Sequence, residues 1–100
     1  MKLENAKEKI IQVCADYFNE CIEENGFEDF NEMKESYSWD SNDIRAEIDS
    51  VITSYLNKLY FNGVEFDIGC HDDTSITIYE NGYIEMSYRE LKKEIFKLVK

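Results

Sequence analysis

The stretch VEFDIGCHDDTSITIYENGYIEMS, residues 64 to 87, decides the fold of this chain. Apolar side chains fall on alternate positions in three segments of it, and such alternation is typical of β-strands with one buried face. The Gly, Asn and Asp residues between the segments favour turns. The stretch therefore predicts a three-stranded antiparallel meander, whose core face carries Val64, Phe66, Ile68, Ile76, Ile78, Ile84 and Met86.

The two loops of the meander set the register of its strands. A two-residue turn in the second loop would place apolar residues opposite polar ones, whereas three-residue loops keep each face uniform. We therefore expect loops at residues 71 to 73 and 80 to 82, which pair Ile76 with Ile68 and with Met86. The opposite face is then polar, with Glu65, Asp67, Ser75, Thr77, Tyr79, Tyr83 and Glu85.

Apolar residues at three- and four-residue steps predict four helices around the meander. The first spans residues 3 to 24, a shorter one covers 27 to 33, a third carries an apolar stripe from 44 to 59, and the last runs through 91 to 98. The chain is thus predicted to be a single α+β domain over residues 1 to 100, in the order ααα-βββ-α. The buried stripe of the first helix is expected to consist of Leu3, Ala6, Ile10, Val13, Cys14, Tyr17, Cys21 and Ile22.

Boundary signals agree with these four helices. Glycine and asparagine favour the position just after a helix, and Ser, Asp and a following Glu favour its start. The expected signals are Asn25-Gly26 and Asn62-Gly63 at helix ends, Asp40 or Ser41 at the start of the third helix, and a capping box from Ser87 to Glu90. We further expect Trp39, in the serine-rich connection before the third helix, to cover the core.

The composition fits a folded protein. Of 100 residues, 43% are hydrophobic and 14% aromatic, too many for a disordered chain even at a net charge of −11. Cys14 and Cys21 lie about 10.5 Å apart along the predicted helix, too far for a disulfide, so free buried thiols are expected. No apolar run approaches the roughly 20 residues of a membrane span, and the first four residues lack the apolar core of a secretion signal. These features predict a cytoplasmic protein.

Acidic residues are concentrated in the middle of the chain. The two ends are mildly basic, whereas residues 14 to 86 hold 18 acids against three cations. On the first helix Asp16, Glu20 and Glu24 repeat at four-residue steps, and such like-charge neighbours destabilise a helix by about 0.2–0.5 kcal/mol per pair. Because the cluster works against local stability, two interpretations arise: a solvated acidic surface, or a surface that docks on a basic one.

Two surfaces are candidates for such docking. The helical surface is purely acidic and consists of Asp16, Glu20, Glu23, Glu24, Glu28, Asp29 and Glu32. The sheet surface consists of Glu65, Asp67, Tyr79, Tyr83 and Glu85, with Tyr79 and Tyr83 as cross-strand neighbours. Rigid aromatic side chains are frequent at the centre of interfaces, whereas surface acids mainly raise the association rate. We therefore expect the sheet surface to anchor a partner and the helical surface to steer it.

Residue types that carry catalysis or bind metals do not form a complete motif. Asp67, Cys70, His71, Asp72 and Asp73 gather near one turn, but no second histidine or paired cysteine completes a metal site. Cys70 and His71 are adjacent and point to opposite faces of a strand, which argues against a catalytic dyad. We expect turn formation here, and neither enzyme activity, a metal nor a cofactor.

In size, acidity and a residue usage typical of AT-rich genomes, the whole chain resembles the small phage and mobile-element inhibitors of the anti-CRISPR and DNA-mimic class. These inhibitors do not share one fold, so no functional residue is transferred from them. The resemblance implies a protein that occupies the positively charged nucleic-acid groove of a bacterial nucleic-acid-processing complex, with a CRISPR effector as the favoured target.

Two other classes fit the same order of elements. A winged helix-turn-helix also combines helices with a β-hairpin, but an acidic surface repels DNA, so we expect no direct nucleic-acid binding. A non-enzymatic partner-binding, immunity or regulatory module with no nucleic-acid link is the main alternative.

Overall fold

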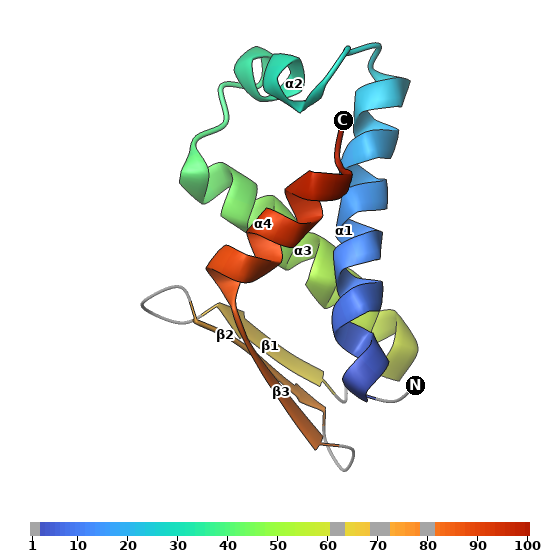
Figure 1. The fold of residues 1–100 in the computed structure, drawn as a ribbon, viewed down its shortest axis with the longest axis vertical. Coiled ribbons are helices and arrows are strands. Elements are labelled where there is room, and N and C mark those ends of the chain that lie inside the picture. Colours follow the sequence, from blue (N-terminus) through green and yellow to red (C-terminus); the bar gives the residue numbers. More distant parts are fainter. Residues whose placement is uncertain (1–2, 61–63, 69–72, 79–81) are drawn as a thin grey trace.

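A computed structural model describes residues 3–60, 64–68, 73–78 and 82–100, without the side chains of 3–5, 60, 64, 78 and 82. Within these residues the order is the predicted one, helices, then strands, then a last helix (Figure 1). The elements are α1 (Leu3–Glu24), α2 (Phe30–Ser36), α3 (Ser41–Tyr60), β1 (Val64–Ile68), β2 (Asp73–Ile78), β3 (Gly82–Ser87) and α4 (Tyr88–Leu98). The α+β class with its ααα-βββ-α order is therefore confirmed.

Helices α1, α3 and α4 pack on one face of the sheet, which lies at one end of a molecule measuring 42 × 27 × 21 Å (Figure 1). The long helix α1 runs from the sheet to the far end of the molecule, where α2 lies. Helix α4 lies between the sheet and α2. Helix α3 contacts β1, while α4 contacts β2 and β3, and α1 contacts β3. Helices α1, α3 and α4 thus all contact the sheet.

The strand order and the two faces of the sheet are as predicted, but the register is not. The structure pairs Ile76 with Phe66 and Ile84, where Ile68 and Met86 were expected. Each hairpin is shifted by two residues, which returns every side chain to the same face. Polarity alone cannot distinguish such registers. Ile68 instead faces Thr74, which is fully buried on the core face.

The aromatic residues of the core gather around the ring of Phe18, which the predicted stripe of α1 omitted in favour of its neighbour Tyr17. Phe18 is fully buried, and its ring lies 5.5 Å from Phe30 of α2, 5.5 Å from Phe96 of α4 and 6.5 Å from Trp39. Trp39 itself is half-buried against the core, as expected. These rings join α1, α2, α4 and the segment before α3 into one cluster.

Local signals fix where α1 ends. The Phe27 N–H donates to the Ile22 carbonyl at 2.9 Å and the Gly26 N–H to the Glu23 carbonyl at 3.3 Å. Gly26 has a φ of +72°, the left-handed conformation that glycine adopts without strain. This is a Schellman motif, and it turns the chain toward α2.

Both predicted helix starts are confirmed, whereas the predicted helix end at Asn62-Gly63 lies outside the described residues. Asp40 and Asp43 cap α3 reciprocally: the Asp43 N–H donates to Asp40 at 2.9 Å and the Asp40 N–H donates to Asp43 at 3.0 Å. Ser87 caps α4 by accepting from the Glu90 N–H. The far ends of the predicted stripes are wrong, because Leu59 and Leu98 are 40% and 49% exposed where the helices extend beyond the core.

The aromatic cluster should carry a large share of the stability. We expect Phe18→Ala to lower the free energy of unfolding by about 3–5 kcal/mol, the usual cost of removing a fully buried ring. Tyr83→Ala removes a ring that is 54% exposed on the opposite side of the sheet and should cost at most about 0.5 kcal/mol. Urea denaturation followed by circular dichroism measures both. Equal losses in the two variants would contradict this core.

Candidate interaction surfaces

The acids of α1 are divided between two sides of the helix. Glu23 forms an ion pair with Lys100, which follows α4, and this partner lowers the pKa of the Glu23 carboxyl. Asp16 and Glu20 instead lie toward α3, beside a hollow between the two helices. The predicted helical surface is therefore not one continuous patch, because Glu23 belongs to the α4 side.

The hollow between α1 and α3, the α1–α3 groove, has a volume of about 400 Å³. Helix α1 contributes Val13, Asp16, Tyr17 and Glu20 to its lining. Helix α3 contributes Val51, Ser54, Tyr55 and Lys58. The groove thus combines valine and tyrosine carbons with two carboxylates and one cation, Lys58, at one site.

A hydrogen bond between the two helices fixes Tyr17 in this groove. Its hydroxyl donates to the Glu47 carboxylate of α3 at 2.8 Å. Burial, and then this hydrogen bond, raise the pKa of Tyr17 above its usual range. The ring is therefore held as a neutral phenol in a defined orientation.

Further carboxylates gather around Cys21, one turn along α1 from Tyr17. Desolvation raises the pKa of the Cys21 thiol, and the negative charges of Glu24, Glu47 and Glu20 raise it further. Burial alone raises the pKa of Cys14 to about 12. Both thiols therefore stay protonated at neutral pH and are poor nucleophiles. Acids from two helices, Glu20 and Glu24 of α1 and Glu47 of α3, thus act on the same thiol.

The remaining acids of the predicted helical surface lie outside the groove lining. Glu28 and Glu32 are exposed near the start of α2. Asp29 caps α2, because its carboxylate accepts from the Glu32 N–H at 2.9 Å. Asp29 therefore has a structural role that the sequence analysis did not assign to it.

The sheet surface differs from the predicted arrangement. Tyr83 lies opposite Thr77, which in turn lies opposite Glu65 of β1. The Tyr83 hydroxyl lies 3.1 Å from the Ser75 hydroxyl. Tyr79, and with it the expected pair of tyrosines, falls outside the described residues. Of this surface the structure describes exposed Glu65, Asp67, Tyr83 and Glu85.

Asp67 is also electrostatically coupled to the helical layer. Desolvation raises the pKa of Asp49 on α3, and the negative charge of Asp67 on β1 raises it further, while a hydrogen bond from Thr53 opposes the shift. Acidic side chains of the sheet edge and of α3 thus repel each other. This repulsion is a further contribution of the concentrated negative charge that lowers the stability of the fold.

The turn with mixed metal-ligand residues, at Cys70, His71 and Asp72, lies outside the described residues. In the part of the chain that the structure describes, no group of three or more His, Cys, Asp or Glu side chains is arranged to hold a metal ion. Across the same described residues, no helix has the length and apolarity needed to cross a membrane.

Comparisons with protein-family models, with curated proteins and with solved structures found no match to this chain. The surfaces are therefore compared by geometry and charge alone. Sequence reasoning missed the contribution of Glu47 and placed Tyr17 and Tyr55 inside buried stripes. The sequence did contain a signal for the groove, because each helix has a valine and a tyrosine four residues apart, Val13 and Tyr17 on α1 and Val51 and Tyr55 on α3. The packing of α1 against α3 brings these two pairs to one site.

Replacing Asp49 should stabilise the protein in a pH-dependent way. A raised pKa means that folding disfavours the ionised carboxylate, so Asp49→Asn should raise the melting temperature at about pH 7, where both states are ionised. The gain should vanish below the unfolded pKa of about 3.9, where both states are protonated. Thermal melts across this pH range test whether the melting temperature rises at neutral pH and whether the gain disappears in acid. Glu28→Gln controls for the change in net charge, and a gain for Asp49→Asn that persists at low pH would contradict the mechanism.

Proposed function

We propose that this chain is an acidic, non-enzymatic inhibitor that docks on the positively charged nucleic-acid groove of a bacterial nucleic-acid-processing complex, with a CRISPR effector as the favoured target. The observation that carries the proposal is the α1–α3 groove, in which an apolar, tyrosine-bearing floor lies beside Asp16 and Glu20. A net charge of −11 gives the whole chain the sign of a nucleic acid.

The groove suits the side chains that line phosphate-binding surfaces. Arginine and lysine have an apolar stem and a cationic head, so they bind best where carbon surface and carboxylates are adjacent. The rings of Tyr17 and Tyr55 can also hold a cation over their faces. Because Glu47 fixes Tyr17 in the free protein, less conformational freedom is lost when a partner binds.

The acids outside the groove would act at longer range. Exposed carboxylates such as Glu24 and Glu85 are solvated, and their main effect is to speed the encounter with a basic surface. This division reverses the expected roles of the two candidate surfaces. The α1–α3 groove is proposed as the anchor because its tyrosines and carboxylates meet in a hollow.

The proposal predicts separate effects on the two rate constants of binding. With an immobilised, guide-loaded Cas9-type effector from a low-GC bacterium, Tyr55→Ala should raise the dissociation rate by about tenfold. Asp16→Lys combined with Glu20→Lys should lower the association rate by about tenfold, and by less at high salt. Fluorescence anisotropy of a labelled recognition duplex measures its displacement from the effector. Both sets of variants should displace the duplex less well than the unmodified chain.

A charge-matched control separates the groove from general acidity. Glu65→Lys combined with Glu85→Lys changes the net charge equally but leaves the groove intact, so it should affect inhibition less. If these sheet variants lose inhibition while the groove variants keep it, the sheet surface is the anchor. If a panel of such effectors binds its duplex unchanged in the presence of the chain, the proposed target class is wrong and a module with no nucleic-acid link is favoured.

A further inference from the structure

Cations gather at the junction of α2, α3 and α4, away from the acidic groove. Only three cations stand in residues 14 to 86, and two of them, Lys34 and Arg45, line hollows at this junction. Arg89 and Lys92 of α4 join them. These hollows are therefore lined by several cations although the chain has a net charge of −11.

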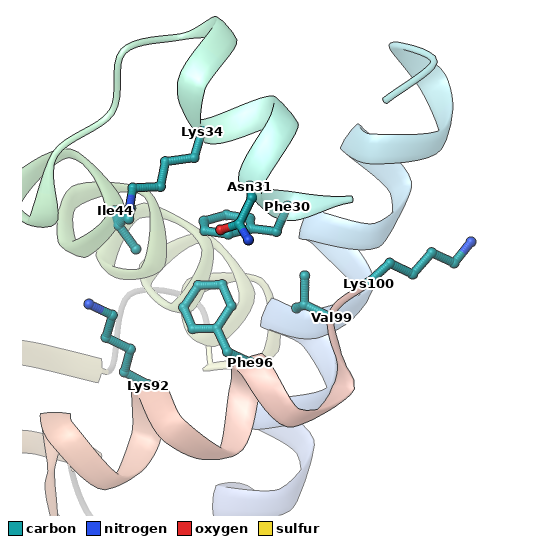
Figure 2. Close-up of a pocket in the computed structure, with 8 residues that line it drawn as sticks. All are labelled: Phe30, Asn31, Lys34, Ile44, Lys92, Phe96, Val99 and Lys100. Atoms are coloured by element: carbon teal, nitrogen blue, oxygen red, sulfur yellow. The ribbon is translucent and has the colours of Figure 1, made fainter. Parts of the chain in front are cut away.

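The larger hollow of this junction, the lysine hollow, has a volume of about 320 Å³. Its walls include Phe30, Asn31 and Lys34 of α2, Ile44 of α3, and Lys92 and Phe96 of α4. Figure 2 shows Lys34 and Lys92 entering from opposite walls, with both ammonium groups on the Ile44 side.

Neither of these two lysines has a carboxylate partner among the residues that the structure describes. Lys34 and Lys92 are half-buried, so part of each side chain is removed from water. Lys100 differs, because it forms an ion pair with Glu23 and its side chain points away from the hollow (Figure 2). The positive charge at the hollow therefore comes from Lys34 and Lys92.

The floor of the hollow is aromatic. The rings of Phe30 and Phe96 lie 4.6 Å apart at an angle of 51°, and both are half-buried. Their contacts with Phe18 hold them in place. Asn31, which follows Phe30 in α2 and also lines the hollow, adds hydrogen-bond donors and an acceptor. A flat ring could thus stack on carbon surface and form polar contacts at its edge.

A second basic hollow adjoins the first and shares Lys92 with it. Its other lining residues include Ser41, Asn42, Arg45 and Arg89. The Arg45 guanidinium lies 4.7 Å from the centre of the Tyr88 ring, which holds this cation in position. The first hollow thus offers an aromatic surface for a flat ring, and the second continues it with further cations.

We propose that the lysine hollow binds a free nucleotide, with its base on Phe30 and Phe96 and its first phosphate between Lys34 and Lys92. A second phosphate would extend toward Arg45. The proposal does not rest on the inhibitor function, since the acidic groove is a different site. A free nucleotide is favoured over a strand because a longer polyanion would meet Asp40 and Asp43 at the start of α3 and the acidic surfaces beyond.

Titration with AMP at low ionic strength tests this site, with Trp39 fluorescence as the signal. Trp39 packs 6.4 Å from Phe30, so a base stacked on that ring should change its emission. AMP should bind saturably and ADP more tightly. Adenosine and inorganic phosphate should each bind at least about tenfold more weakly than AMP, because each uses half of the site.

Charge-matched variants locate the binding. Lys34→Ala combined with Lys92→Ala should weaken AMP binding at least about tenfold, whereas Lys9→Ala combined with Lys93→Ala, on exposed positions, should leave it nearly unchanged. Asn31→Glu keeps every lysine, places a carboxylate at the hollow, and should also abolish binding. Its fold should persist, since an acid in the first turn of a helix is favourable.

Several results would overturn the proposal. Absence of saturable AMP binding would mean that the lysine stems only cover apolar surface, as exposed lysines commonly do. Equal affinity for AMP and adenosine would exclude phosphate recognition, and equal affinity for AMP and inorganic phosphate would exclude the aromatic floor. Tighter binding of a short oligonucleotide than of ADP would identify a strand, not a free nucleotide, as the ligand.

Discussion

The packing of the Phe18 ring is the interaction on which the rest of the structure depends. This one fully buried ring lies 5.5 Å from both Phe30 and Phe96, so it fixes α1 against α2 and α4 at once. Trp39, 6.5 Å away, adds the segment that leads into α3. Dispersion and apolar burial at this point therefore hold Phe30 and Phe96 in place, and these two rings line the lysine hollow.

The same packing determines which neighbours the acidic side chains of α1 face. With α1 held at its centre, Asp16 and Glu20 face α3, while Glu23 faces the end of α4 and pairs with Lys100. The like-charge repulsion within α1 is a cost that apolar burial must offset, since exposed ion pairs contribute little. The α1–α3 groove with its carboxylates and the lysine hollow with its cations thus share no lining residue.

Much of the fold could be predicted from the sequence because the signals were local. Alternation gave the faces of the sheet, and Gly26, Asp40 and Ser87 marked helix boundaries through hydrogen bonds to residues nearby. The strand register could not be predicted, because a shift of two residues leaves every side chain on the same face. The choice between Tyr17 and Phe18 also failed, since adjacent aromatic residues fit a helical stripe almost equally well.

The functional surfaces were less predictable than the fold. The acids were found from spacing alone, but the α1–α3 groove needs Tyr17 beside Glu47 and Tyr55, residues that are distant in sequence. The lysine hollow likewise needs Lys34 of α2 and Lys92 of α4 to enter from opposite walls. Such sites come from tertiary packing, and helical periodicity carries no information about them.

The central claim is that the α1–α3 groove recognises a basic partner. Its most direct test is an NMR titration of the ¹⁵N-labelled chain with an arginine-rich peptide. The account predicts saturable amide shifts that are largest along Asp16, Glu20, Val51 and Tyr55 and that shrink as salt is added. Shifts that are largest on the outer face of the sheet, around Tyr83, or that are spread evenly over all exposed acids, would contradict it.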